Sequence, residues 1–485
     1  MALVTVVLSL IFSAWMLRRE LRLRPGLSSA LWIPTILLML ISSRPVAEWV
    51  GKGSPGDEAS NPLDAGVYLC LIGASLFIGS SRGVKWGKLL AMNVPLLLLY
   101  AYFVSSIVWS DDPMGSAKRI GKDFALLFVI GLILSEKEPL QAIRSIFVRG
   151  ASVLFPLSIV FDRWVPRFGR EFAKNGTVAY SGVTTQKNSL GEIVLVFSMI
   201  LLWDYLEIRS TGSRSRLLRG AQWDRLALLL MGALLLYQSQ SKTSLFCLLI
   251  AVALGIRKGA LATKPISIVA YAVVFSTPFF LFLSTEFGYL IEPIVKALGR
   301  DLTFTGRTNI WSQITLSTVN PILGCGYWVF WKGPGGAAIS TAVQWTVPTA
   351  HCGYLDVYLD GGFLGLFLFF CVLAAYGWRL IKQSQKERFH LVGLAVLSAA
   401  IVYNLTESAF LRTGPLWFVV LVMIVEMPRK KRKGKYVQEE LSNVNRTNRT
   451  QPAVVARFDS PAMTPVNVRT EVYGRSYRQT ANNQR

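Results

Sequence analysis

The chain has 485 residues, of which 52% are apolar and only 16% are charged, and its formal net charge is +23. This composition excludes a set of ordinary soluble domains, because apolar runs recur throughout the first 427 residues. Several of these runs approach the roughly twenty residues that cross the hydrocarbon core of a bilayer. In lipid the backbone has to satisfy its own hydrogen bonds, so we predict an all-α polytopic membrane protein.

The apolar runs predict the membrane-spanning helices in chain order. Several runs are short, so the pattern supports eleven to thirteen crossings rather than one definite number. The predicted spans are residues 2–16, 27–42, 66–81, 90–108, 120–135, 145–161, 190–206, 226–238, 243–256, 265–283, 362–381, 391–405 and 414–427.

The positive charge lies mainly in short segments between these spans, as is typical of cytoplasmic loops. This location favours a topological role for the charge over nucleic-acid binding. The N-terminus is then outside and the C-terminus inside. The basic segments are 18–24, 80–88, 209–225, 257–264, 382–388 and 429–435. The connections placed outside are 43–65, 109–119, 162–189, 239–242, 284–361 and 406–413.

Two long segments differ in composition from the predicted membrane domain, residues 1–427. The external loop 284–361 is rich in Trp, Tyr, Gly and Ile, so we expect it to be folded, with helices near 305–319 and 351–361. The tail 428–485 has little apolar content, and we predict a disordered cytoplasmic extension. Its first basic residues can contact anionic lipid headgroups.

His351 is the histidine of interest. The chain has two histidines, and His390 lies beside Lys386 and Arg388 in a predicted cytoplasmic loop, where a role at the membrane surface suffices. His351 lies at the end of the long external loop, just before an apolar span. It is therefore the one imidazole predicted on the external face, either as a functional group or as a satisfied histidine of a folded loop.

Several cations accompany this histidine on the external side. Lys242 lies in a tight turn between two apolar runs, where a lysine could simply reach the headgroup layer. Lys187 and Asn188 could be no more than the start of a helix. Arg307 opens a helical pattern, which is an unfavourable place for a cation relative to the helix dipole and indicates another reason for its presence.

No metal or cofactor is predicted. The external loop has no cluster of His and Cys at ligand spacing, and no phosphate-binding glycine-rich loop precedes a helix. Asp111 and Asp112, before Pro113, have the pattern of turn residues, and an oxidising compartment could join Cys325 to Cys352. Several cations and one imidazole remain, which suit a diphosphate and a hydroxyl proton respectively.

The motifs resemble those of the O-antigen ligase and polymerase superfamily. Three consecutive stretches carry the resemblance: TGRTNIW (305–311), NPILGCGY (320–327) and HCGYLDVYLDGGFLGL (351–366). Upstream, SSIVWSDDP (105–113), GVTTQKNSLG (182–191) and SQSKTSL (239–245) are similar to the exopolysaccharide polymerase branch. The likeness extends over roughly residues 90–420, and it depends on the order and spacing of the motifs together.

The resemblance implies a bacterial inner-membrane protein with its active face in the periplasm. It implies metal-independent transfer of a glycan from undecaprenyl diphosphate to an acceptor hydroxyl. The implied partners are the lipid-linked glycan, an acceptor glycan or lipid A core, the bilayer and other polysaccharide-assembly proteins, with no nucleic acid.

Residue by residue, the resemblance makes His351 the base or the group that orients the acceptor. It makes Arg307 a ligand of the diphosphate, and it places Lys242 where many members have arginine. Lys187 and Asn188 belong to the matching K-N-x-x-G stretch and are expected to bind substrate.

Two positions depart from the family pattern. Cys352 stands where asparagine commonly follows the histidine, and Gln186 stands where some polymerase-like members have another histidine. The upstream stretches favour a polymerase modestly over a ligase. A transporter or flippase that moves the lipid-linked oligosaccharide without chemistry is the alternative, and it predicts ionisable groups near the bilayer midplane on broken helices.

Overall fold

The structure is a computed structural model that describes residues 2–52, 61–172, 178–211, 215–255, 268, 271–272, 274–276, 307–315, 317–384 and 388–427. The regular structure of these residues is helical apart from one antiparallel pair of strands, β1 (Arg170–Phe172) and β2 (Val178–Tyr180). The all-α polytopic fold is therefore confirmed. The tail, the first part of the long loop and most of the predicted span 265–283 lie outside the described residues.

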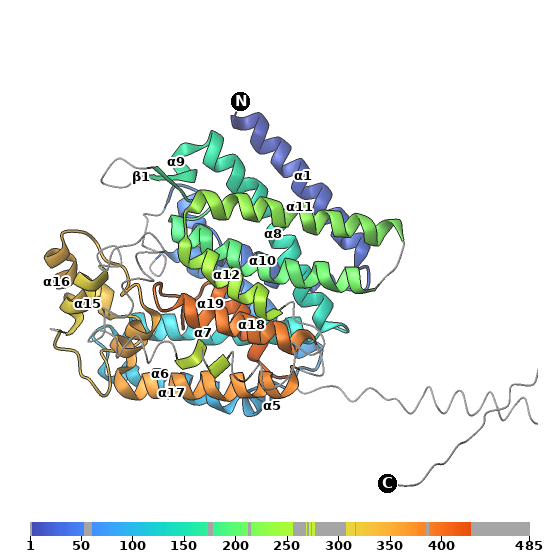
Figure 1. The fold of residues 1–485 in the computed structure, drawn as a ribbon. Helices are drawn as coiled ribbons and strands as arrows, with labels where there is room; N and C mark the ends of the chain where they lie inside the picture. The colour runs from blue at the N-terminus through green and yellow to red at the C-terminus, as the bar shows by residue number, and fades with distance from the viewer. Residues whose placement is uncertain are drawn as a thin grey trace, which may run out of the picture. The chain divides into compact units, whose positions relative to one another are not determined.

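The first half of the described chain forms long apolar helices with short connections (Figure 1). They are α1 (Ala2–Leu23), η1 (Ser29–Leu31), α2 (Trp32–Ile41), α3 (Val46–Trp49), α4 (Pro62–Ser81), α5 (Trp86–Met92), α6 (Val94–Ser105), η2 (Ser106–Trp109), α7 (Pro113–Leu134), α8 (Pro139–Trp164) and α9 (Pro166–Gly169).

The second half contains the remaining long helices and the folded part of the external loop. They are α10 (Lys187–Ser210), α11 (Arg216–Ser239), α12 (Lys242–Gly255), α15 (Arg307–Thr315), η4 (Phe330–Lys332), α16 (Pro334–Val343), α17 (Gly353–Gln383), α18 (Arg388–Tyr403) and α19 (Pro415–Ile424). Every predicted span except 265–283 coincides with a helix, and several helices extend beyond the apolar run into polar sequence.

Local signals explain where these helices begin. Asn61, Asp112 and Ser215 each accept a hydrogen bond from a backbone N–H in the first turn of the helix that follows. Proline stands at the start of α4, α7, α8, α16 and α19, where its missing N–H costs no helical hydrogen bond. Asp112 is thus a helix cap, which agrees with the expectation of a turn residue.

Five described helices are long and apolar enough to cross a bilayer, namely α1, α4, α8, α10 and α17. A sixth candidate is the pair formed by α5 with α6 and η2, bent by 98° at Asn93. Shorter apolar helices, η1 with α2, α12, α18 and α19, add to these. The chain is therefore a multi-pass membrane protein, and the figure of eleven to thirteen crossings stays a prediction.

Burial differs strongly among the helices. All ten residues of α19 are buried, and α19 packs against α2, α7, α10 and α18. In contrast, only 17% of the most apolar window of α1 and of α4 is buried. Their exposed side chains are largely Leu, Val, Ile and Phe, as expected for surfaces that face lipid rather than water.

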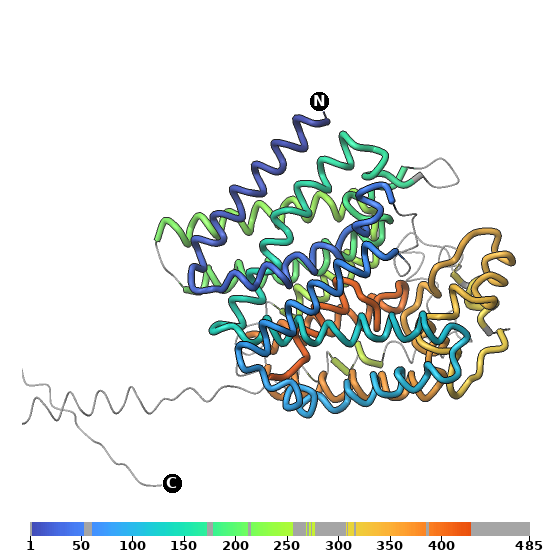
Figure 2. Tube along the Cα trace, turned by 180° about the vertical axis from the view of Figure 1, so that it is seen from behind, coloured from blue at the N-terminus to red at the C-terminus, as the bar shows by residue number. Residues whose placement is uncertain are grey.

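The segments assigned to one side of the membrane gather at one end of the helices. At the end predicted to be cytoplasmic, Arg24, the residue after α1, pairs with Asp204 of α10, which also accepts from Arg225 of α11 at 2.8 Å. At the other end lie β1, α9, α15 and α16, on the same side in both views (Figures 1 and 2). The grouping of the loops by charge therefore agrees with the arrangement of the helices.

The folded part of the external loop has its own small hydrophobic core. Ile310 and Ile314 of α15 pack with Phe330, Ile339 of α16 and Val347. This core confirms the expectation of a folded loop, and α15 falls within the predicted helical stretch.

The loop joins the membrane helices at a break in α17. Gly362 has φ 60° and ψ −163° inside this helix, a backbone conformation essentially restricted to glycine. The break frees the next N–H groups, so Phe363 donates to the Pro321 carbonyl at 2.8 Å and Leu364 to that of Ile322 at 3.2 Å. The predicted loop helix and the predicted span are thus one bent helix.

Candidate functional site

Glu407 is the centre of the candidate site. It lies in the turn between α18 and α19 and is only 7% exposed. Its Oε1 accepts from Arg307 Nη2 at 2.6 Å and from Asn188 Nδ2 at 2.9 Å. Its Oε2 lies 3.6 Å from Nδ1 of His351. One carboxylate therefore gathers three predicted site residues from three distant parts of the sequence.

The helix α15 positions Arg307 and supports the histidine turn. Arg307 is the first residue of α15, and one turn later Trp311 donates from Nε1 to the Ala350 carbonyl at 2.9 Å. Arg307 is 7% exposed, and its Nη1 is buried without a hydrogen-bond partner among the described residues. The guanidinium therefore keeps donor capacity beyond its pair with Glu407.

His351 lies in a left-handed backbone conformation, with φ 50°. For a residue other than glycine this conformation costs about 1 kcal/mol or more, so neighbouring contacts have to hold it. Ala350 donates its N–H to Asp356 Oδ1 at 3.0 Å, and the His351 N–H reaches Thr349 Oγ1 at 3.3 Å. The imidazole is 18% exposed, so it is held by the turn and remains partly accessible.

Gly353 brings the histidine turn against the Glu407 turn. Its N–H donates to the carbonyls of Asn404 and Glu407, at 2.9 and 3.0 Å. A Cβ at this position would lie 2.1 Å from Oδ1 of Asn404, so no larger residue fits without a shift. Asn404 Oδ1 also accepts from the N–H groups of Ala409 and Phe410, at 2.7 and 2.9 Å, which fixes the turn itself.

The predicted lysines lie beside this turn, on the ends of two packed helices. Lys187 is the first residue of α10 and Lys242 the first residue of α12, and both side chains are exposed. The two helices meet closely at Gly191, where a Cβ would lie 2.5 Å from the Cβ of Ser241. Thr243 Oγ1 is 2.8 Å from Oγ1 of Thr406, the neighbour of Glu407.

Cys352 contributes to packing. It precedes the first residue of α17, and its partly buried side chain contacts the main hydrophobic core. Burial raises the pKa of the Cys352 thiol to about 11. All five cysteines are unpaired, so the disulfide between Cys325 and Cys352 does not form in this structure.

Sequence reasoning missed Glu407. The available signal was one carboxylate between two strongly apolar spans. Glu407 is the second residue of the short connection 406–413, which is predicted to be external. His390, at the start of α18, lies near the other end of that helix from Tyr403 and the Glu407 turn. Gln186, which stands where some polymerase-like members have another histidine, is the exposed residue that precedes α10.

The site combines a paired arginine, two exposed lysines and an imidazole beside a carboxylate. Cations of this kind bind phosphate oxygens, and an imidazole oriented by a carboxylate can accept a proton at its other nitrogen. Within the described ranges no three His, Cys, Asp or Glu side chains gather as metal ligands. The side chains of the site can supply charge stabilisation and proton transfer.

No family model matches the chain. It is similar to the exopolysaccharide production protein ExoQ of Rhizobium meliloti, with 24% identity over 318 residues, which cover 63% of this chain and 69% of that protein. This similarity confirms the resemblance to the O-antigen ligase and polymerase superfamily that the motifs indicated.

Proposed function

We propose that this chain is a membrane glycosyltransferase that moves a glycan from undecaprenyl diphosphate to an acceptor hydroxyl. Its similarity to a protein of exopolysaccharide production supports a role in polysaccharide assembly. The chemistry takes place on the periplasmic face of the bacterial inner membrane. We favour the polymerase form, in which the acceptor is another lipid-linked glycan, over the ligase form, in which it is lipid A core.

The convergence of His351, Arg307 and Asn188 on Glu407 carries this proposal. Asn188 lies 219 positions before Glu407 and Arg307 lies 100 positions before it, yet these residues meet at one end of the membrane helices. A group of cations with one imidazole at this place fits a lipid whose diphosphate lies at the membrane surface and whose sugar extends into water.

In the proposed reaction the acceptor oxygen forms a bond to the anomeric carbon while the bond from that carbon to the diphosphate oxygen breaks. Arg307 and Lys242, with Lys187 beside them, stabilise the negative charge that develops on the leaving diphosphate. The free donor capacity of Arg307 Nη1 supports this role. In a partly dry site each such charge has a larger effect than in water.

His351 takes the proton of the acceptor hydroxyl as the new bond forms. Nδ1 of His351 faces Glu407, so Nε2 is the nitrogen proposed to receive the proton. Glu407 then stabilises the imidazolium, as the carboxylate of a catalytic triad does. Glu407 is a positioning residue in this scheme, since it acts through His351 and Arg307.

The test is glycan transfer by the purified protein in lipid, supplied with an undecaprenyl-diphosphate-linked oligosaccharide. We expect longer lipid-linked products without any added acceptor. Transfer only to added lipid A core would replace the polymerase form with the ligase form. Unchanged substrate in both reactions, together with movement of the lipid between leaflets of a vesicle, would favour the flippase and contradict the proposal.

A further inference from the structure

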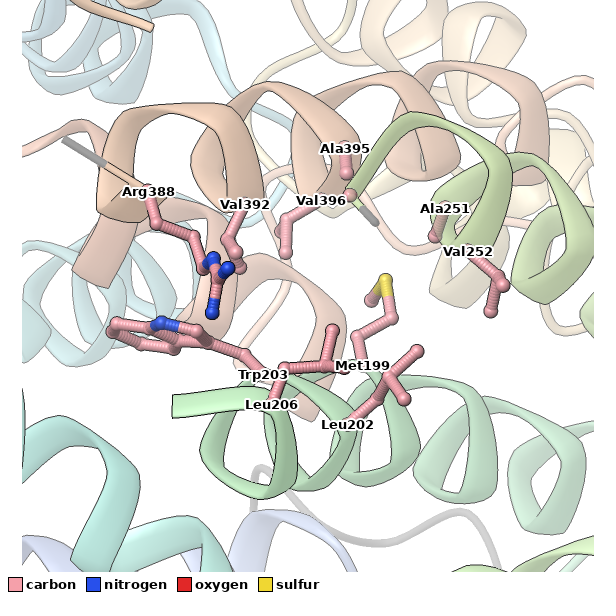
Figure 3. Close-up of a pocket in the computed structure, with 11 residues that line it drawn as sticks. Met199, Leu202, Trp203, Leu206, Ala251, Val252, Arg388, Val392, Ala395 and Val396 are labelled. Carbon is pink, nitrogen blue, oxygen red and sulfur yellow. The ribbon is translucent and has the colours of Figure 1, made fainter. Parts of the chain in front are cut away.

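A groove between α10, α12 and α18 lies at the opposite end of these helices from the candidate site (Figure 3). It encloses about 360 Å³, part of which is open to the exterior. The lining is apolar apart from one end, and it consists of Met199, Leu202, Trp203, Leu206, Ala251, Val252, Gly255, Arg388, Val392, Ala395 and Val396.

Two hydrogen-bond donors meet at the polar end. In Figure 3 the guanidinium of Arg388 and the indole nitrogen of Trp203 face one another there. Trp203 is 3% exposed, and its Nε1 is buried without a hydrogen-bond partner in the described part of the chain. The same holds for Nη1 of Arg388, whose ion pair with Glu207 is long, at 3.5 Å. A buried donor without an acceptor costs free energy, so an acceptor bound at this end would stabilise the structure.

The surrounding charge favours an anionic acceptor. Asp204, next to Trp203, is shared by the guanidinium groups of Arg24, Arg144 and Arg225. The guanidinium carbon of Arg144 lies 5.3 Å from the centre of the Trp203 ring. Glu20 also pairs with Arg24 and Arg225. Four guanidinium groups, those of Arg24, Arg144, Arg225 and Arg388, therefore face three carboxylates, those of Glu20, Asp204 and Glu207. The oxygens of a phosphate would balance the remaining positive charge.

We propose that the groove binds an anionic phospholipid. One acyl chain lies along the apolar lining, and a phosphate oxygen accepts hydrogen bonds from Trp203 Nε1 and Arg388. The groove begins twelve residues beyond Lys187 on α10, roughly 18 Å along the helix. The site is therefore separate from the candidate active site, and it belongs to the end of the helices where the basic loops gather.

The test is a lipid titration of the full-length protein in mild detergent, followed by native mass spectrometry. Phosphatidylglycerol is the probe, and phosphatidylcholine with the same acyl chains is the comparison. We expect the anionic lipid to bind more tightly. Arg388→Gln and Trp203→Phe should each weaken its binding on the order of tenfold, because each removes one donor to the phosphate.

Matched variants distinguish a specific lipid site from non-specific attraction of the anionic lipid to basic residues. Arg209→Gln removes an exposed cation at the same end of α10 and should bind the lipid as the unaltered protein does. Val252→Phe should fill the groove and weaken both lipids, whereas Ala253→Phe, at the exposed neighbour, should weaken neither. Equal binding by Arg388→Gln and Arg209→Gln would overturn the proposal. Equal affinity for both lipids would also overturn it, as would displacement of phosphatidylglycerol by an equimolar polyprenyl phosphate.

Discussion

A buried carboxylate is costly unless charged or hydrogen-bonding partners surround it. Glu407 meets this condition through Arg307 and Asn188, and it places its second oxygen beside His351. The hydrogen bond holds the arginine in place, and the carboxylate faces the imidazole. At the scale of single residues, we therefore expect the proposed activity to depend on this carboxylate as much as on the two groups proposed to touch the substrate.

His351→Ala should reduce glycan transfer by about 10²–10⁴-fold, the usual contribution of a general base. The variant should still insert in the membrane, because the imidazole is partly exposed and contributes little to packing. Product formation from the lipid-linked oligosaccharide measures the effect. His390→Ala removes the other histidine and should leave the rate unchanged. Near-normal transfer by His351→Ala would rule out the role of His351 as the base.

Glu407→Gln should lower kcat by roughly ten- to a hundredfold, because the negative charge that pairs with Arg307 and faces His351 is lost. The amide keeps the shape of the side chain but leaves Arg307 without its counter-charge and His351 without its orienting group. A positioning role predicts a fall in kcat with a smaller change in KM. The control is Glu426→Gln, which breaks the 3.1 Å pair with Arg379. A loss of Tm that accounts for the whole loss of activity would instead indicate a structural role.

At the scale of elements, the bend in α17 decides where the external loop meets the membrane helices. Gly362 supplies a conformation that other residues rarely adopt, and the freed N–H groups then bind the carbonyls of Pro321 and Ile322. Upstream of the bend, Cys325 and Gly326 donate to the carbonyls of Leu359 and Asp360, at 2.9 and 3.1 Å. The loop is thus bonded to both halves of the bent helix.

Gly362→Ala should destabilise the protein by about 1–3 kcal/mol, because the backbone conformation is strained for any residue with a Cβ. The added Cβ would also lie 2.3 Å from the carbonyl carbon of Ile322. The expected result is a lower Tm in detergent. Gly66→Ala is the matched control, since that helical position is open and alanine favours helix. Equal Tm values for the two variants would contradict this interpretation.

The ion cluster that joins α1, α10 and α11 should contribute to the stability of the protein at least as much as Gly362 does. Asp204→Asn removes the carboxylate shared by Arg24 and Arg225 and leaves buried positive charge, a change that costs about 3–5 kcal/mol. Thermal unfolding followed by the release of buried thiols measures it. Glu138→Gln alters an exposed carboxylate and should change the Tm little. An unchanged Tm for Asp204→Asn would show that the cluster does not stabilise the helices.

At the scale of the whole molecule, the two ends of the helices differ in their charge chemistry. One end carries the ion cluster and the groove proposed to bind a phospholipid, and the other carries Glu407 and the folded loop. Because the described parts of the predicted cytoplasmic segments meet at the first end and those of the predicted external segments at the second, each end should face one compartment.

Cysteine labelling tests this sidedness on α10, whose two ends are exposed at Lys187 and Arg209. On a background with Cys70 and Cys371 replaced by serine, Lys187→Cys should react with a membrane-impermeant maleimide added to intact spheroplasts. Arg209→Cys should react only after the membrane is opened. Labelling of both positions from outside would refute the predicted topology.

The sequence alone was enough for the helices and for most of the candidate site. A helix in lipid satisfies its own backbone hydrogen bonds, so apolar runs and basic loops determine spans locally. The described spans accordingly coincide with helices. His351 and Arg307 stood out because an imidazole or a charge is unusual beside such spans, and Asn188 stood out through its place in the K-N-x-x-G stretch.

Only the tertiary structure decided which of these residues meet. Glu407 attracts no attention as one carboxylate in a short connection, and its importance comes from the partners that α10, α15 and the histidine turn bring to it. The bend at Gly362 and the groove with Trp203 and Arg388 likewise became visible only in the tertiary structure. Contacts between distant segments depend on how helices pack, and hydrophobic periodicity records which face is apolar but not which partner covers it.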